Sequence, residues 1–329
     1  MLTAQDLRGV IAIPPTPSKE GADRWDATNT VDTDELARGL NQLIEDGVNG
    51  IITFGTTGEC ATLSSEDWQT AADCVISTVN HRVPLFVGAT TLGVHETVKR
   101  LRFIKERGAD GTILGLPMWQ AFTVPMAVEY YATISEAFPD LAIMVYGNSN
   151  AFRFHFPIPF WAQVSKRAPT IITTKFSNPA MHLALVHVTE GRIAFLPHVA
   201  GAYTQARIDP ASTKASWSTD ASMGPAPSIA QMEAILAEDW ERAKEINADL
   251  AWAGATFFPP GGFEEFGSYN IQLEKIRFDA AGYMKAGPIR PPYNVVPEAY
   301  AENARECGRR SAQLQQKYAP LVAKAKATA

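Results

Sequence analysis

One lysine stands apart from its surroundings in the sequence. Lys175 is the only charged residue in the run PTIITTKFSNP, so we expect it to be buried or to lie at a functional site. Burial lowers the pKa of a lysine amine, and a neutral amine is the nucleophile that forms a Schiff base with a ketone. The alternative is a structural lysine that extends from a strand end into solvent. Position alone leaves both interpretations open.

Two further features supply groups that Schiff-base chemistry needs. Tyr146 ends the segment LAIMVYGN, where a phenol could shuttle protons while an amine adds to a carbonyl. A core tyrosine is the alternative. The turn GTTGE (55–59) offers two glycines, two hydroxyls and backbone N–H groups, which together can hold a substrate carboxylate. We expect Gly55 and Thr56 to bind substrate and Thr57 to relay a proton to Tyr146, with a plain turn as the alternative.

Three polar side chains near other expected strand ends could complete a site. Asn148 lies two residues after Tyr146, and Asn270 lies in the C-terminal part of the chain. Either amide could orient a water molecule, although most asparagines form turns. His198 ends the segment FLPH. It could bind a substituent of the substrate, act as acid or base, or make a structural hydrogen bond.

Aromatic residues also gather near the expected strand ends. They are Trp119, Phe152, Phe154, Phe176 and Trp217. Such side chains could enclose a flat ring of the substrate. Ordinary packing is the alternative, and we expect it to hold for at least half of them. We place Trp119 and Trp217 in the site, and prefer Trp217 because it lies between two serines.

The elements that would position these residues alternate along the chain. Short, nearly continuous apolar runs are typical of parallel strands covered on both faces, and helical patterns such as 32–47 and 64–79 lie between most of them. The expected strands are residues 10–17, 50–56, 84–90, 111–117, 141–148, 170–176, 192–198 and 215–220. Eight βα units predict an α/β fold, a TIM (β/α)8 barrel with its active site at the C-terminal strand ends. A doubly wound sheet is the second architecture, but no GxGxxG follows the first strand.

The C-terminal part is expected to be a helical extension. We assign residues 1–240 to the barrel that carries the active site and residues 241–329 to helices packed on it. The expected helices are 228–253, 270–282 and 297–316. No flexible linker precedes them, which argues against a separate domain.

Composition excludes several classes of function. The 329 residues are 46% hydrophobic and 19% charged, with a net charge of −6 and no basic cluster, so we expect no nucleic-acid partner. We find no apolar run that approaches the roughly 20 residues of a membrane span, and no signal peptide. Three cysteines without metal-ligand spacing suit a reducing cytosol. We therefore expect a cytoplasmic protein without a metal and without a membrane contact.

The combination of motifs resembles a known family. GTTGE, the tyrosine of VYGN and the lone lysine of TTKF are similar to the dihydrodipicolinate synthase / N-acetylneuraminate lyase superfamily, and the similarity includes GADG at 108–111. The resemblance implies that Lys175 forms an imine with pyruvate or a pyruvate-derived substrate. It also implies that Tyr146 shuttles protons and that Thr56 and Thr57 bind the pyruvoyl carboxylate. It further implies that no cofactor is needed and that the chain forms a homotetramer.

Two segments of the sequence differ from the dihydrodipicolinate synthases, and these differences narrow the range of activities that the resemblance implies. YGNSNAFRFHFP lacks the arginine motif that dihydrodipicolinate synthases carry after the fifth strand, and GLPMWQ replaces their fourth-strand loop, which argues against lysine biosynthesis. Other stretches resemble the hydratase-aldolases of aromatic-hydrocarbon breakdown, which add water to a benzylidenepyruvate and cleave the product to an aromatic aldehyde and pyruvate. These stretches are GECATL (58–63), LGLPMW (114–119), AFRFHFPIPFWA (151–162), FLPH (195–198), YNIQLEK (269–275) and DAAGYMKAGPIRPPYN (279–294).

The expected substrate is therefore an ortho-substituted benzylidenepyruvate. A 2-hydroxyphenyl group would indicate naphthalene breakdown and a 2-carboxyphenyl group phenanthrene breakdown, and the sequence leaves both open. One alternative is another pyruvate-dependent class I aldolase or a dihydrodipicolinate-synthase-like lyase, although aromatic strand ends disfavour a sugar-acid substrate. The other is a non-catalytic barrel that binds a keto acid, which the presence of both Lys175 and Tyr146 disfavours.

Overall fold

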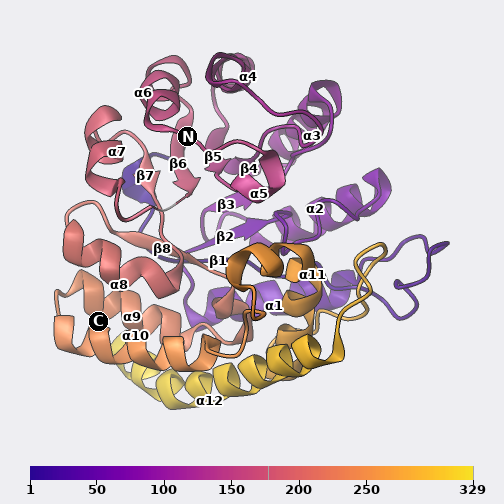
Figure 1. Cartoon of the computed structure of the whole chain (residues 1–329), viewed down its shortest axis with the longest axis vertical. Coiled ribbons are helices and arrows are strands. Elements are labelled where there is room, and N and C mark those ends of the chain that lie inside the picture. The colour runs from indigo at the N-terminus through magenta and orange to yellow at the C-terminus, as the bar shows by residue number, and fades with distance from the viewer. Residues whose placement is uncertain (177, 329) are drawn as a thin grey trace.

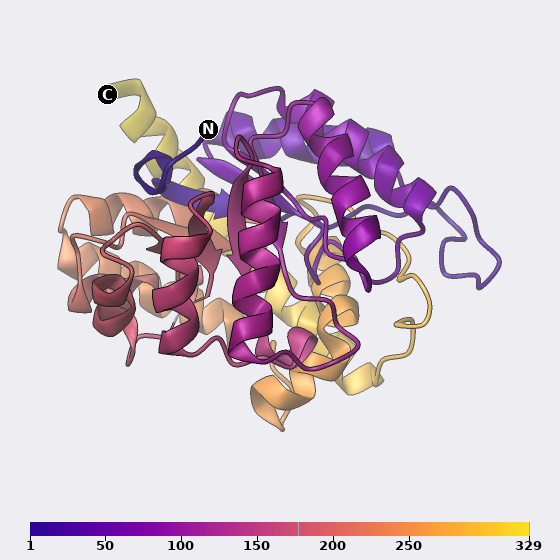
Figure 2. The same ribbon diagram turned by 90° about the horizontal axis from the view of Figure 1, so that it is seen from above.

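The computed structural model describes residues 1–176 and 178–328, with only the backbone described for 324–328. Eight parallel strands form one curled sheet in the order β7-β6-β5-β4-β3-β2-β1-β8, with helices around it (Figures 1 and 2). The strands are β1 (Gly9–Ala12), β2 (Gly50–Thr53), β3 (Leu85–Val87), β4 (Gly111–Leu114), β5 (Ala142–Tyr146), β6 (Ile171–Lys175), β7 (Ala194–Phe195) and β8 (Ala215–Ser218). The predicted TIM barrel is confirmed.

Each expected strand exists, but each is shorter than the apolar run that predicted it. Tyr146 and Lys175 are the last residues of their strands, and the loops that follow the C-terminal strand ends carry further predicted site residues, among them Thr56 and Trp119. The helices of the barrel are α1 (Thr33–Asp46), α2 (Ser65–Val79), α3 (Val94–Glu106), α4 (Val124–Ala137), α5 (Ser149–Phe152), α6 (Ile158–Arg167), α7 (His182–Val188) and α8 (Val199–Ile208). Side-chain caps begin several of them; the Asp32 carboxylate, for example, accepts from the Glu35 N–H at the start of α1.

The barrel closes at a seam between β7 and β8. β7 has only two residues, and the contact continues beyond it, where Trp217 N–H donates to Pro197 O at 3.0 Å. His198 and Trp217 form an isolated parallel bridge at the same place. Two predicted site residues therefore lie at the closure of the barrel.

The predicted helix at 228–253 is wrong in one respect, because the structure divides it in two. α9 (Ala226–Leu236) and α10 (Trp240–Gly254) are separated at Glu238, whose φ is 56°, and Asp239 caps α10 by accepting from Arg242 N–H. The amphipathic pattern continues across the break, so periodicity did not reveal it. α11 (Gly262–Ala281) and α12 (Glu298–Thr328) are longer than predicted.

The C-terminal helices pack on one side of the barrel, where α12 runs along the edge in Figure 1. α11 contacts the chain just after β8 through Arg277, which donates to Thr219 and Asp220. A second apolar cluster fills the space between these elements; it comprises Met223, Phe257, Phe266, Leu273, Phe278, Ala286, Ala304 and Cys307. The domain boundary at residue 240 stays a prediction. Within the described ranges no helix is long and apolar enough to cross a membrane.

Candidate active site

Lys175 ends β6, and the sheet register places it beside Tyr146 at the end of β5. Its Nζ lies 3.6 Å from the ring centroid of Trp217 and 4.9 Å from that of Tyr146. Among the residues that the structure describes, no carboxylate forms an ion pair with this amine, which is half-buried. The lysine therefore faces aromatic rings at the barrel mouth rather than a counter-ion.

The Tyr146 hydroxyl is held from two sides. The Thr56 side-chain oxygen lies 2.8 Å from it, and Thr56 N–H donates to it at 3.4 Å. The Asn148 amide donates to the same hydroxyl at 3.3 Å, and the Phe152 ring packs edge-on against Tyr146 at 5.2 Å. The tyrosine thus has a fixed hydroxyl within reach of the GTTGE turn.

The hydroxyl that meets Tyr146 belongs to Thr56, whereas the sequence prediction placed Thr57 there. The Thr57 side chain is buried, and no hydrogen bond joins it to Tyr146 among the described contacts. Periodicity says nothing about which hydroxyl of an irregular turn points where, so adjacent threonines could not be told apart. A relay through Thr57 stays a prediction, and Thr56 has the geometry for one.

The GTTGE turn has an unusual backbone. A Cβ at Gly58 would lie 2.5 Å from Phe54 N, so only glycine fits there. Phe54, which precedes the turn, and Glu59, its last residue, are left-handed with φ of 53° and 58°. Gly55 lies against Tyr146, with 3.5 Å from a built Cβ to Cε1. Strained backbone of this kind persists where its surroundings fix it, often at functional sites.

His198 packs against Trp217 where the barrel closes between β7 and β8. Their ring centroids are 4.5 Å apart in an edge-to-face arrangement. His198 Nδ1 accepts from Ala200 N–H at 3.2 Å, and its Nε2 lies 3.7 Å from the Asp220 carboxylate. Burial lowers the pKa of His198 to about 4 despite the nearby Asp220. The imidazole is therefore neutral at neutral pH, with its hydrogen on Nε2.

A charged cluster that the sequence analysis missed lies behind His198. Arg277 on α11 pairs with Asp220 at 2.7 Å and with Glu274 at 2.8 Å. Burial tends to raise the pKa of Asp220, but the Arg277 guanidinium and His198 hold it below its usual range. Burial raises the pKa of Glu274. The sequence does carry a sign of this cluster, the charged residues between apolar ones in YNIQLEKIRF. The same pattern is typical of an amphipathic helix on the surface, which is how the sequence analysis interpreted it.

The two predicted amides have different surroundings. Asn148 Oδ1 accepts from Ala151 N–H and caps α5, so this amide is already occupied on both sides. Asn270 lies one helical turn before Glu274, a group close enough to Lys175 for the amine to affect its pKa. In the described part of the chain, Asn270 Oδ1 is buried without a hydrogen-bond partner. Buried polar atoms are rarely left unpaired, so this oxygen is suited to a ligand.

The other aromatic candidates divide between packing and solvent. Phe154, Phe156 and Phe176 pack with one another in a ring cluster around α6. Trp119 is 81% exposed in the loop after β4, and its carbonyl accepts from Arg153. No described ring contact links Trp119 to Lys175, so its place in the site stays a prediction. Trp217 Nε1, by contrast, is buried without a partner among the described groups.

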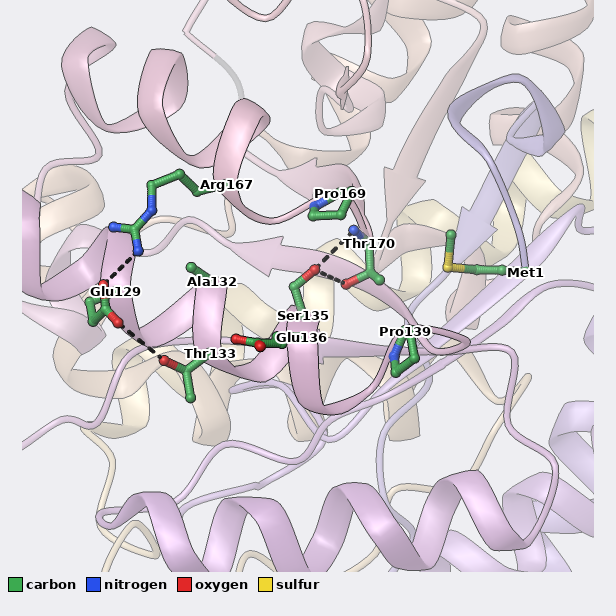
Figure 3. A pocket seen from close by; sticks show the side chains of 10 residues that line it. All are labelled: Met1, Glu129, Ala132, Thr133, Ser135, Glu136, Pro139, Arg167, Pro169 and Thr170. Atoms are coloured by element: carbon green, nitrogen blue, oxygen red, sulfur yellow. Dashed lines mark hydrogen bonds and ion pairs between the residues drawn. The ribbon is translucent and has the colours of Figure 1, made fainter.

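A hollow of about 600 Å³ lies elsewhere, at the N-terminal ends of β5 and β6 (Figure 3). Its polar lining groups pair with one another: Ser135 Oγ accepts from Thr170, and Arg167 pairs with Glu129. Lys175 is at the other end of β6, so this hollow is separate from the candidate active site. Across the described ranges, no group of three or more His, Cys, Asp or Glu side chains could hold a metal ion.

Comparisons with known proteins point to one family. Residues 8–177 match the model of the dihydrodipicolinate synthetase family. The chain is 46% identical over 321 residues to a trans-O-hydroxybenzylidenepyruvate hydratase-aldolase of Pseudomonas putida, covering 96% of each chain. It is 36% identical over 326 residues to a trans-2'-carboxybenzalpyruvate hydratase-aldolase of Nocardioides sp. (strain KP7), covering 98% of each.

A solved structure has nearly the same shape. PhdJ bound to a substrate intermediate superposes with a TM-score of 0.93 at 36% identity, over 96% of this chain and 99% of that one. The similarity extends over the barrel and the C-terminal helices together.

Proposed function

The chain belongs to the dihydrodipicolinate synthetase family, and from this premise we propose that it is a hydratase-aldolase for an ortho-substituted benzylidenepyruvate. The observation that carries the proposal is the arrangement around Lys175. Its amine lies 3.6 Å from the Trp217 ring, next to a Tyr146 hydroxyl that is tied to the GTTGE turn. That geometry unites a nucleophile, an acid–base group and an aromatic wall at one barrel mouth.

The first step forms the imine. The Lys175 amine adds to the 2-oxo carbon of the arylidene pyruvate while Thr56 and Thr57 bind the carboxylate. Tyr146, hydrogen-bonded to Thr56 at 2.8 Å, shuttles the protons as the carbinolamine loses water. The iminium that results is conjugated with the substrate's double bond and withdraws electrons from its far end. No cofactor is required, since the lysine imine is the electron sink.

Hydration follows at the benzylic carbon. Water adds there, the electron pair moves to the imine nitrogen as an enamine, and a proton at C3 restores the iminium. We assign the water to Asn270, because its buried Oδ1 lacks a partner among the described groups, whereas both ends of the Asn148 amide are engaged. Asn148 then serves to orient Tyr146.

Cleavage uses the same electron sink. Tyr146 removes the benzylic hydroxyl proton, the C3–C4 bond breaks, and its electron pair enters the iminium to give an enamine. The aromatic aldehyde leaves, the enamine carbon is protonated, and hydrolysis frees pyruvate and Lys175. Trp217 and His198 form the wall against which the aryl ring lies.

We assign the ortho substituent as a hydroxyl, which corresponds to naphthalene rather than phenanthrene breakdown. His198 is neutral and so offers no positive charge to a substrate carboxylate, and the Asp220 carboxylate lies 3.7 Å from its Nε2. A second substrate carboxylate would be repelled by Asp220 and Glu274, and Arg277 is already paired with both. The relative from Pseudomonas putida, named for a hydroxyl-bearing substrate, is also more similar in sequence than the carboxy-type relative.

Two assays test the proposal. Purified protein with trans-2-hydroxybenzylidenepyruvate should release salicylaldehyde and pyruvate, and kcat/KM should be lower with the 2-carboxy substrate. Borohydride added with pyruvate should leave a reduced adduct on Lys175, mapped by mass spectrometry. An adduct without aldehyde release from either substrate would indicate another pyruvate-dependent aldolase, and absence of an adduct would indicate a non-catalytic keto-acid binder.

The cellular setting and assembly are part of the same proposal. Cys60, Cys74 and Cys307 are free thiols, which supports a cytoplasmic location. An apolar groove of about 700 Å³ runs along α3, α4 and α6 and includes the exposed Val94 and Met126, which supports burial of that face in a homotetramer. Light scattering of the purified protein measures the assembly directly.

A further inference from the structure

α11 carries a lysine that, unlike the half-buried Lys175, is fully buried. The Lys275 side chain is 1% exposed, and its Nζ donates to Glu59 Oε2 at 3.0 Å and to Ser18 Oγ at 2.9 Å. Arg290, which follows α11, also donates to Glu59 Oε2. One carboxylate oxygen, on the last residue of the GTTGE turn, is therefore held by two cations from the C-terminal part of the chain.

The same cluster extends to the N-terminal part of the chain. Arg290 donates to Thr16 O, Pro17 O and Thr30 O at 3.1–3.2 Å, and to Thr30 Oγ1 at 2.7 Å. Thr16 Oγ1 in turn donates to Gly58 O within the turn at 2.8 Å. The loop between β1 and α1 and the loop between α11 and α12 lie side by side in both views (Figures 1 and 2). The turn is thus tied to both ends of the chain.

This arrangement is a costly way to stabilise a fold. Burial lowers the pKa of Lys275 to about 8 even though Glu59 favours the charged form. A buried ion pair often contributes no more stability than well-packed apolar side chains of the same size. What it provides is a fixed direction for the carboxylate. Glu59 needs such a constraint, because its backbone is left-handed with a φ of 58°.

We propose that Lys275 is a positioning residue of the active site that acts through Glu59 on the GTTGE turn. Glu59 lies two and three residues after Thr57 and Thr56, so fixing its side chain fixes the conformation in which Thr56 meets the Tyr146 hydroxyl. The inference rests on the proposed function, in which this turn binds the keto-acid carboxylate. Lys275 does not touch the substrate, since its amine is enclosed by Glu59 and Ser18.

The substitution Lys275→Met tests this proposal. It removes the amine, keeps the length of the side chain and leaves Glu59 paired one to one with Arg290. We expect the KM for pyruvate in the synthetic direction, and the pyruvate concentration for half-maximal borohydride trapping, to rise roughly 10–100-fold, as for loss of a supporting shell. The KM for the aromatic aldehyde should change less than about 3-fold, because the aldehyde does not contact the turn.

Three further variants separate positioning from stability. Glu59→Gln removes the charge that Lys275 holds, and Glu59→Gly removes the side chain while relieving the left-handed backbone; both should reproduce the KM defect for pyruvate. Leu314→Ala, buried in α12 away from the turn, should lower Tm and leave both KM values unchanged. A purely structural role of Lys275 would lower Tm and the active fraction without moving KM.

The outcomes discriminate between the inference and the proposed function. If wild-type protein fails to trap pyruvate, the proposed function is wrong. If it traps pyruvate and Lys275→Met or Glu59→Gln folds with an unchanged KM for pyruvate, only the inference is overturned. If none of the Lys275 and Glu59 variants folds, the cluster is required for the fold itself and the positioning role is also rejected.

Discussion

Lys175 and Lys275 are both withdrawn from bulk solvent, yet their surroundings differ in every respect that matters for reactivity. Lys175 ends a strand, faces the rings of Trp217 and Tyr146, and has no carboxylate partner among the described residues. Lys275 lies on a helix, is 1% exposed, and is fully engaged by Glu59 and Ser18. An amine over aromatic faces can still reach a carbonyl, whereas an amine enclosed by an acid and a hydroxyl cannot.

Residue type and burial do not by themselves assign a lysine's role. The rings of Trp217 and Tyr146 lie beside the Lys175 amine and supply no counter-ion that would enclose it, so a substrate carbonyl can approach it. The ion pair with Glu59 makes Lys275 a constraint on geometry rather than a reagent.

Lys175→Ala should have the largest effect. Without the amine no imine forms, so aldehyde release should fall by about 10⁴-fold or more, towards the uncatalysed background. The fold should persist, because Lys175 is at a strand end and not in the core. Circular dichroism checks the fold, and borohydride trapping should show no adduct. Substantial turnover, or an adduct on Lys275 instead, would show that Lys175 is not the reactive lysine and that the two lysines do not have separate roles.

Tyr146→Phe should have the next largest effect. It keeps the ring that faces Lys175 and removes the hydroxyl shared with Thr56 and Asn148. Loss of a positioned acid–base group lowers kcat by about 10²–10⁴-fold, with substrate still bound. Thr56→Val is the matched control, since it removes only the hydroxyl's partner and should cost less. A wild-type kcat for Tyr146→Phe would remove this residue from the mechanism.

Much of this arrangement could be predicted from the sequence because it depends on strand ends. Lys175, Tyr146 and the GTTGE turn follow from apolar runs whose C-terminal ends meet at one barrel mouth. The division between Thr56 and Thr57 could not be predicted, since it depends on the irregular backbone between Phe54 and Glu59.

The contributions of α11 were harder to predict for a related reason. Lys275 and Arg277 look like the solvent-facing charges of an amphipathic helix, and only the packing of α11 on the barrel shows them to be buried. The break at Glu238 escaped prediction because the apolar pattern runs through it. Contacts between segments distant in sequence have no periodicity of their own.

The pH dependence of stability should distinguish Lys275 from an ordinary ion pair. The pKa of Lys275 in the folded protein, about 8, is below its usual 10.5. Between these values the unfolded chain binds more protons, so this lysine makes the folded state more stable as pH rises from 8 to 10.5. The gain amounts to about 3 kcal/mol. Denaturant unfolding across this range should show the rise in wild-type protein and its loss in Lys275→Met; equal slopes would contradict the assignment.

Trp217→Phe should have the smallest effect. It tests the role of the aromatic ring next to Lys175. The indole lies 3.6 Å from the Lys175 amine, so Trp217→Ala would disturb the nucleophile as well as the ring wall. Phenylalanine retains a flat face over the amine and removes the Nε1–H that lacks a partner among the described groups. Loss of part of an aromatic stack costs about 0.5–1.5 kcal/mol, or roughly 2–13-fold in a binding constant. We expect that loss in the KM for the aromatic aldehyde in the synthetic direction, with little change in pyruvate trapping.

Lys275→Met should show the opposite pattern, because it acts on the carboxylate turn. If both variants instead weaken pyruvate and aldehyde equally, the two sides of the mouth are one coupled unit, and the separation of roles between Lys175's aromatic wall and the turn held by Lys275 is wrong.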